Sequence, residues 1–334
     1  MKNYLLLLYS LLLMSCTETY EPYQFERSEA ISFNPLNYPA LLGYTVQLIH
    51  EDGDLFIYDF YGDTLITQFD LEKEQIKKKW VTIGNGPGEL NNPLDMQYID
   101  RRLYLLGRSQ HLMTHLSFEN DTTLFVKDFQ LPDASDRFVA LTPTQFVFSG
   151  FWDNRYVWMN RSDSDSLVGF GDYPSFWEEE KTIPSSAKAM FHQSMFAKHP
   201  SEALFASGSW YVLEIFRYDP AGVNPPQRQF QKQLGRYSYD HTSGNMVTAT
   251  VRPGSDLAVS GICCSEKYIY LIRPLTTASC EILVVNWAGE PVMKLESDKY
   301  VSCLTIDEKA GKGYACITDP EDRLVWFDLP DMEE

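Results

Sequence analysis

Two histidines in this chain have a spacing that can do metal chemistry. His111 and His115 stand at i and i+4, which on a helix would point both imidazoles at one zinc ion. They lie, however, in a stretch with the position and composition of a strand, where four residues span about 13 Å. Zinc bonds are only about 2 Å long, so we expect no metal here. The chain also lacks the H-E-x-x-H, G-x-S-x-G and Cys-x-x-Cys motifs, and we predict no catalytic residues, metal ligands or cofactor.

A glycine-rich loop, Gly84-Asn85-Gly86-Pro87-Gly88, has the look of a phosphate-binding turn. A phosphate loop needs Lys-Ser/Thr after its last glycine and a helix that begins there. Here Glu89 follows the last glycine, and the next residues do not predict a helix. We therefore expect the glycines to supply positive φ angles in a tight connection between two sheets.

The N-terminus has the features of an export signal. Lys2 precedes a largely apolar run from Tyr4 to Met14, which is too short for a bilayer crossing of about 20 residues and suits a signal peptide. Leu13-Met14-Ser15-Cys16 resembles the bacterial lipobox. The resemblance implies cleavage before Cys16 and acylation of its thiol and amino group. An ordinary secretory signal with a chance cysteine is the alternative.

These features divide the chain into three parts. We expect a lipoprotein signal peptide over residues 1–15, the lipidated cysteine with a polar, flexible tether over 16–30, and one folded domain over 31–334. Net charge is −18, and the largest basic cluster is Lys77-Lys78-Lys79. A chain this acidic is a poor partner for nucleic acid.

Five cysteines follow Cys16, all in the C-terminal quarter of the chain. Their odd number excludes a fully paired disulfide framework. Buried free thiols are the simplest interpretation. One disulfide, for example between Cys303 and Cys316, is the alternative in an exported protein.

A repeated pattern of short apolar strands runs along the whole chain. The first strand of the pattern recurs at 55–58, 103–106, 146–148, 203–206, 268–271 and 313–316. A second strand follows most copies, at 65–70, 156–160, 214–219, 283–287 and 324–328. The average period of about fifty residues suits a four-stranded propeller blade. The last repeat stops near Asp328, so residues 31–50, with two β-like runs, are expected to supply the missing strands and close the ring.

Two connections between repeats are much longer than the others, at 171–201 and 237–261. The first contains an apolar pattern that predicts a helix over 185–198, with Pro200 just beyond it. Both connections join the outer strand of one repeat to the inner strand of the next. In a propeller such connections lie at one rim, so we expect the two insertions to share a face.

The stretch from Ile83 to Met96 looks like the G-x-G-P-G-E-x-x-x-P linker of NHL-type repeats. The predicted helix, His199-Pro200 and the strand at 203–206 are together similar to the TolB-like, six-bladed propeller lipoproteins of gut-type anaerobes. This resemblance implies an all-β, six-bladed β-propeller with one short helical insertion, and a location at the cell envelope, most simply the outer membrane. It implies no catalytic residues.

Acidic residues at the axis hold calcium or catalytic metals in some propeller lactonases and NHL-type lyases. Asp59, Asp95, Asp153 and Asp319 flank the repeated strands and could reach such a position. Aspartate after a strand more often stabilises a turn, which is what we expect here. A metal-dependent propeller enzyme of lactonase or lyase type stays open as the alternative function.

The favoured function is non-enzymatic binding of a glycan, a peptide or an envelope protein by a membrane-anchored propeller. Trp177, Phe191 and Phe196 are aromatic residues near the proposed binding rim, and exposed rings suit sugars and peptides. His192 and Arg252 would orient a polar or anionic group. We therefore predict Trp177, Phe191, His192 and Arg252 as ligand-binding residues. The alternative is that the rings only pack the insertion onto the blades.

Overall fold

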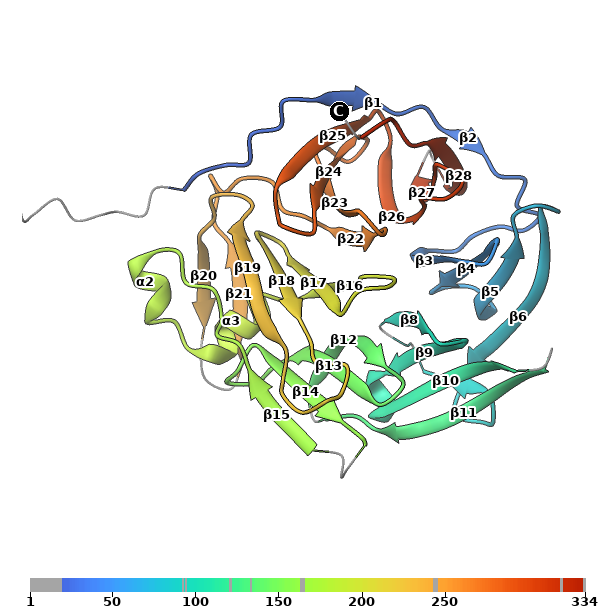
Figure 1. The fold of residues 1–334 in the computed structure, drawn as a ribbon, viewed down its shortest axis with the longest axis horizontal. Coiled ribbons are helices and arrows are strands. Elements are labelled where there is room, and N and C mark those ends of the chain that lie inside the picture. The colour runs from blue at the N-terminus through green and yellow to red at the C-terminus, as the bar shows by residue number, and fades with distance from the viewer. Residues whose placement is uncertain are drawn as a thin grey trace, which may run out of the picture.

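A computed structural model describes residues 20–91, 93, 95–119, 122–132, 134–162, 166–242, 246–318 and 321–332. Six mainly antiparallel sheets stand around a central axis as the blades of a propeller (Figure 1). The predicted all-β, six-bladed fold is therefore confirmed. The predicted signal peptide, Cys16 and Asp319 lie outside the described residues.

Each blade is built from consecutive strands, named here from the axis outward, and blades 5 and 6 each gain one strand from the N-terminal segment. Blade 1 contains β3 (Thr45–Glu51), β4 (Asp54–Asp59), β5 (Thr64–Asp70), β6 (Gln75–Ile83) and β7 (Glu89–Leu90), and blade 2 contains β8 (Met96–Ile99), β9 (Arg102–Gly107), β10 (Leu112–Glu119) and β11 (Thr122–Gln130). Blade 3 contains β12 (Ser135–Thr142), β13 (Gln145–Gly150), β14 (Tyr156–Asn160) and β15 (Ser166–Phe170), and blade 4 contains β16 (Met195–Lys198), β17 (Leu204–Ser209), β18 (Val212–Arg217) and β19 (Gln227–Gln233). Blade 5 contains β22 (Gly261–Cys264), β23 (Tyr268–Pro274), β24 (Cys280–Asn286), β25 (Pro291–Ser297) and β1 (Ser28–Ala30), and blade 6 contains β26 (Tyr300–Asp307), β27 (Lys312–Thr318), β28 (Asp322–Asp328) and β2 (Asn34–Pro35).

The repeated apolar strand is the second strand of each blade and not the innermost one, which corrects the strand order inferred from the sequence. β4, β9, β13, β17, β23 and β27 are these second strands. In β17, for example, every residue is buried, because the strand has neighbours in its own sheet and adjacent blades on both faces. Innermost strands face the axis on one side, so they keep polar residues and give a weaker signal, as in β3, where most residues are only half-buried.

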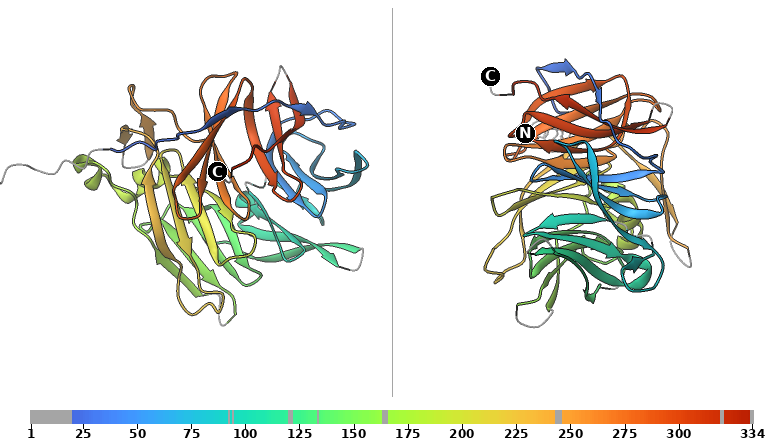
Figure 2. Two further views of the ribbon diagram at one scale, coloured as in Figure 1. Left: turned by 45° about the horizontal axis from the view of Figure 1, so that its top comes forward. Right: turned by 90° about the vertical axis from the view of Figure 1, so that its right-hand side faces the viewer.

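The N-terminal segment closes the ring, as the unfinished last repeat predicted. β2 pairs antiparallel with β28 and forms the outermost strand of blade 6. β3 belongs instead to blade 1, where it is the innermost strand. The segment before β2 also pairs: β1 lies parallel to β25 on the outer edge of blade 5. Figure 2 shows this segment crossing the outer side of blades 5 and 6.

The predicted flexible tether is wrong for its described part, which is docked on the propeller. The Tyr20 hydroxyl donates to the Leu234 carbonyl over 3.1 Å, and the Tyr23 hydroxyl donates to the Gly289 carbonyl over 2.7 Å. Tyr23 and Phe25 also pack against the apolar core shared by blades 4 and 5. Aromatic residues in an otherwise polar segment explain this docking, because their burial outweighs the ordering of the chain.

The insertions lie between blades 3 and 4 and between blades 4 and 5, as predicted. The first carries two short helices, α2 (Glu178–Lys181) and α3 (Ser185–Phe191). The helix predicted over 185–198 therefore ends at Phe191, and 195–198 is β16, because the apolar pattern runs on into the innermost strand of blade 4. The second insertion forms the hairpin β20 (Tyr239–Thr242) and β21 (Thr248–Val251). A single turn of 3₁₀ helix, Arg108–Gln110, follows β9.

All five cysteines of the propeller are free thiols. Cys303 and Cys316 face each other as paired residues of β26 and β27, and both are buried. Within the described part of the chain, no helix combines the length and the apolar character that a membrane crossing requires.

Candidate binding site at the insertion rim

The candidate site lies at the rim of the propeller that carries both insertions. In an antiparallel four-stranded blade, the turn between the second and third strands and the crossing to the next blade meet at the same end of the sheet. This end is called the insertion rim below. The β13–β14 turn, α3 and the β20–β21 hairpin all lie there, and α3 contacts both strands of the hairpin. The prediction that the insertions share one face is therefore confirmed.

Stacked aromatic rings join the two insertions. The Phe191 ring centroid lies 3.9 Å from that of Tyr239 and 5.2 Å from that of Tyr237. Trp177 meets Tyr237 edge-on at 4.8 Å and is half-buried. Phe191 is only 1% exposed, so it forms the core of the insertions and reaches a ligand only if they separate. Phe196 is also buried, between the Tyr156 and Phe205 rings. Phe191 and Phe196 therefore match the alternative interpretation, in which the rings pack the insertion onto the blades.

His192 makes a buried contact with a carboxyl group. Its Nε2 lies 3.2 Å from Glu180 Oε1, and the Phe176 N–H and the Tyr237 hydroxyl donate to the same carboxyl. Burial raises the Glu180 pKa to about 7, and burial with the nearby Arg155 charge holds the His192 pKa well below its ordinary value. His192 is therefore neutral and enclosed. This placement corrects the expectation that it orients an anionic ligand.

Arg252 is the predicted residue that reaches solvent most freely. Its guanidinium pairs with Asp240 Oδ1 at 2.7 Å across the exposed β20–β21 hairpin. Asp240 is the ion-pair partner of Arg252, whereas His192 Nε2 contacts Glu180, so the structure gives these two predicted residues different partners. Arg252 and Trp177 are the two predicted residues available to a ligand without rearrangement.

A buried ion pair between blades 3 and 4 holds the first insertion in place. Arg155, immediately before β14, donates through Nε to Glu214 Oε2 at 2.6 Å, and the two side chains are 1% and 0% exposed. The Tyr156 hydroxyl also donates to this oxygen, while Arg228 and Gln231 donate to the other carboxylate oxygen at 3.0 Å. Arg155 reaches up to the His192 carbonyl as well. Both oxygens of the Glu214 carboxylate and the Arg155 guanidinium have hydrogen-bond partners. This network therefore fixes blade 3 against blade 4 and the first insertion.

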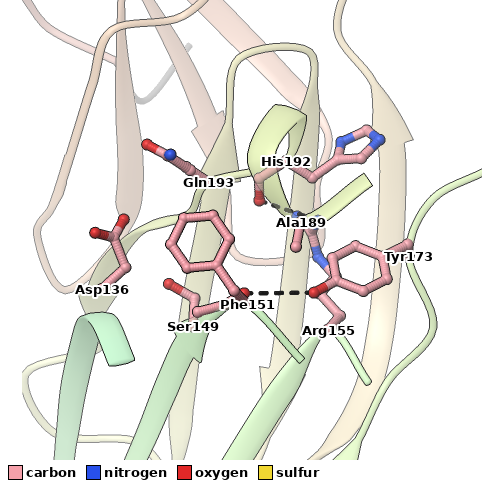
Figure 3. A pocket seen from close by; sticks show the side chains of 9 residues that line it. Asp136, Ser149, Phe151, Arg155, Tyr173, Ala189, His192 and Gln193 are labelled. Atoms are coloured by element: carbon pink, nitrogen blue, oxygen red, sulfur yellow. Dashed lines mark hydrogen bonds between the residues drawn. The ribbon is translucent and has the colours of Figure 1, made fainter. Parts of the chain in front are cut away.

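A small pocket opens between the β13–β14 turn and the first insertion. It is lined by Asp136, Ser149, Gly150, Phe151, Arg155, Tyr173, Ala189, His192 and Gln193. In Figure 3, Asp136, Ser149 and Phe151 lie on one side of it and Arg155 and Tyr173 on the other, while the His192 ring points away. The Tyr173 hydroxyl donates to the Gly150 and Trp152 carbonyls and closes one wall.

The pocket holds one polar atom that the protein leaves unsatisfied. Ser149 Oγ is buried and has no hydrogen-bond partner among the described residues. A buried hydroxyl without a partner costs about 1–3 kcal/mol, so a water molecule or a ligand group is expected to bind it. The space is about that of one water molecule. Beside the pocket, Arg108 is half-exposed, pairs with Asp136 Oδ1 at 3.0 Å and lies over the Phe151 ring.

Apart from His192, sequence reasoning did not find these pocket residues. One signal was available: Glu214 is the one charge within the otherwise apolar run 212–216, and such a charge predicts a buried partner. Nothing in the sequence identifies Ser149, because its role depends on the insertion that covers it.

A second recess lies between the outer strands of blades 2 and 3, with a volume of about 550 Å³. Its charged groups are satisfied by one another. Asp128 accepts a 2.7 Å hydrogen bond from Arg161, whose guanidinium also lies over the Phe129 ring, and contacts His115 Nδ1 at 3.1 Å. This recess offers a ligand fewer unsatisfied polar groups than the rim pocket does.

The described aspartates do not fit a metal ion. Asp59 accepts hydrogen bonds from the N–H groups of Gly43, Tyr44 and Tyr61, which is the turn role expected for it. Asp95 is buried, accepts from two backbone N–H groups, and burial raises its pKa to about 6. Asp153 is exposed. Within the described ranges, no three His, Cys, Asp or Glu side chains are grouped as metal ligands, and His111 lies in a turn, apart from strand β10.

The glycine-rich loop lies in the crossing from blade 1 to blade 2, as predicted. Glu89 folds back, and its carboxylate accepts a 2.7 Å hydrogen bond from the Gly86 N–H. Gly88 has a φ of +77°, which favours glycine. The loop therefore already contains its own anion and leaves no cradle for a phosphate.

Comparison with known proteins agrees with the architecture. A family model described as TolB-like 6-blade propeller-like matches residues 36–309. No curated protein sequence matches the chain. Among solved structures, a candidate exported protein of Bacteroides fragilis is similar, with a TM-score of 0.56, 11% identity, and coverage of 91% of this chain and 99% of the other. A gluconolactonase of Xanthomonas campestris is similar to the same degree, with a TM-score of 0.56, 10% identity, and coverage of 93% and 95%. At these identities the likeness shows the fold alone.

Proposed function

Because this chain belongs to the TolB-like six-bladed propeller family, we propose that it is an exported, lipid-anchored binding protein of the cell envelope. Its insertion rim binds a polar group of a glycan, a peptide or an envelope protein. The rim pocket carries this proposal, because it combines a buried, unsatisfied hydroxyl with a half-exposed guanidinium at its edge.

The export and anchor half of the proposal rests on Leu13-Met14-Ser15-Cys16. The similarity to a candidate exported protein agrees with it. Cys16→Ser should abolish labelling by a fatty acid and move the protein from the membrane pellet to the soluble fraction. If the variant still takes up the label and stays in the pellet, the anchor is not at Cys16.

The binding half rests on pocket chemistry. Ser149 Oγ can both donate and accept a hydrogen bond, which suits a sugar hydroxyl or a peptide amide. Phe151 supplies an apolar surface beside it, and Arg108 lies over this ring, where a polar or anionic group of the ligand would meet it. The pocket is too small for a whole ligand, so we expect it to take one group while the rest of the molecule lies on the rim.

Binding is tested with the mature chain carrying Cys16→Ser and displayed panels of glycans and peptides. Ser149→Val fills the pocket with methyl groups, and Arg108→Ala removes the guanidinium beside it. Lys309→Ala, in the exposed β26–β27 turn on the opposite rim, is the matched control. Both rim variants should lose affinity about tenfold or more, as expected for a lost hydrogen bond worth about 1.5 kcal/mol. If both bind as tightly as the Lys309→Ala control, the pocket is not the site.

The second candidate function is a propeller enzyme of lactonase or lyase type, favoured by the fold shared with a gluconolactonase. The described aspartates do not gather into a metal site, which argues against it. Hydrolysis of gluconolactone is measured with added calcium or manganese and with a chelator. Turnover that depends on the metal would favour the enzyme over the binding protein.

A further inference from the structure

The course of the first described residues fixes where a lipid anchor can lie. Tyr20 is half-buried at the insertion rim between blades 4 and 5, and its hydroxyl donates to the Leu234 carbonyl. Asp256, Arg273 and Arg236 are close enough to act on its pKa. Only four residue steps separate Cys16 from Tyr20, and an extended chain covers at most about 14 Å in that distance.

This reach is short compared with the propeller. A domain of this length is roughly 50 Å across, so the anchor cannot extend to the far side of the ring. The tether cannot become longer without breaking contacts, because Tyr23, Phe25 and β1 hold the following residues against blades 4 and 5. In Figure 1 the described chain begins on the side of the ring that carries α2 and β20, and the left view of Figure 2 shows the same arrangement.

The same corner exposes apolar side chains. Trp210 lies in the β17–β18 turn, Leu257 follows the β20–β21 hairpin, and Leu275 follows β23, so all three are at the insertion rim of blades 4 and 5. They are 37%, 48% and 41% exposed. Tryptophan is typical of the interface between lipid and water, and a contiguous exposed apolar patch is typical of a protein or membrane contact.

We infer that the insertion-rim corner of blades 4 and 5 rests on the lipid surface, with Trp210, Leu257 and Leu275 in contact with the head-group region. This inference depends on the proposed acylation of Cys16. The protein's net charge of −18 disfavours anionic lipid, so the surface that fits is zwitterionic. The rim pocket, farther along the same rim at blade 3, then opens close to the membrane.

The test compares two samples by hydrogen exchange. One is the acylated protein in vesicles of phosphatidylethanolamine and phosphatidylcholine, and the other is the soluble Cys16→Ser protein. Amides around Trp210, Leu257 and Leu275 should exchange several-fold more slowly in the vesicle sample. The loop at Val223, which is exposed on the opposite rim, is the internal control and should not change.

Two variants show whether the short tether causes the contact. A flexible linker of about 20 Gly and Ser residues before Tyr20 has a root-mean-square length of about 25 Å. It should remove the protection while the protein stays in the pellet. Trp210→Ser with Leu257→Ser should weaken it. If acylated protein shows no protection, or shows it at Val223, the orientation is wrong although the anchor stands. If Cys16 takes up no acyl label, the anchor and the orientation both fail.

Discussion

Glu180 and His192 form a buried pair whose two members should respond to pH in opposite directions. The folded protein keeps the Glu180 pKa near 7, above the ordinary value of 4.5. It therefore holds a proton that the unfolded chain has released, and stability falls as pH rises from about 4.5 to 7. His192 behaves in the reverse sense, because its pKa is lowered in the fold. The unfolded chain gains a proton below about pH 6.5, so stability falls as pH drops.

The size of each effect follows from linkage. One pH unit within the Glu180 window is worth about 1.4 kcal/mol, and below about pH 6.5 the His192 contribution opposes it. Replacing one member of the pair leaves the pH dependence of the unfolding free energy that comes from the other. Relative to wild type, Glu180→Gln should lose about 2 kcal/mol of stability between pH 6.5 and pH 5. His192→Gln should gain stability over the same interval, because the folded protein holds the His192 pKa well below its ordinary value.

Urea unfolding at pH 5, 5.75 and 6.5 measures these slopes, with the m value checked for each protein. Glu179→Gln and His241→Gln replace exposed residues of α2 and β20 and serve as matched controls. Both controls should run parallel to wild type. Should the Glu180→Gln and His192→Gln curves also run parallel to it, the two groups are solvated and the insertion does not bury them as described.

Three further predictions concern the buried residues and strands that support the insertion rim. Glu214→Gln should lower the free energy of unfolding in urea by about 3–5 kcal/mol, because it leaves the buried Arg155 charge without its partner. Removing the half-exposed Arg228 should lower it by less than about 1 kcal/mol. Equal losses would refute the difference in burial. Deletion of residues 20–35 should lower the melting temperature in one cooperative step, since it removes β1 and β2 from blades 5 and 6, and an unchanged melting temperature would refute closure by this segment. Phe191→Ala should cost about 3–5 kcal/mol by opening a cavity between the insertions, and a cost near that of an exposed residue, below about 0.5 kcal/mol, would show that the ring is not enclosed.

The sequence was sufficient for the blades because burial leaves a strong pattern in one strand of each. The second strand is enclosed on both faces, so it reads as a short apolar run, as in Asp54–Asp59. Innermost strands such as Met96–Ile99 are short and mixed, so their positions could not be assigned. The error over residues 185–198 has a related cause. Four residues of β16 continue the apolar spacing of α3, and hydrophobic periodicity alone does not mark where a helix ends.

The candidate site was harder to predict, because its residues are defined by contacts between distant segments. Aromatic residues in the first insertion suggested a ligand, but their partners Tyr237 and Tyr239 come from the second insertion. Composition cannot show that the rings of one insertion will be covered by those of the other. The docking of Tyr20 and Tyr23 was missed for the same reason, since a polar segment predicts a tether when its few aromatic residues have no visible partner.

The enclosed rings and the buried ion pairs give the insertion rim a different role from the one their composition suggested. A ring such as Phe191, which is 1% exposed, contributes no contact area to a ligand, but it fixes the backbone that carries the pocket wall. The Arg155–Glu214 pair fixes the same wall from below. A site whose frame is held this way loses little entropy when a ligand binds. Recognition then depends on the few side chains that the frame leaves accessible, and substitutions there should change affinity without changing stability, whereas substitutions in the frame should change stability first.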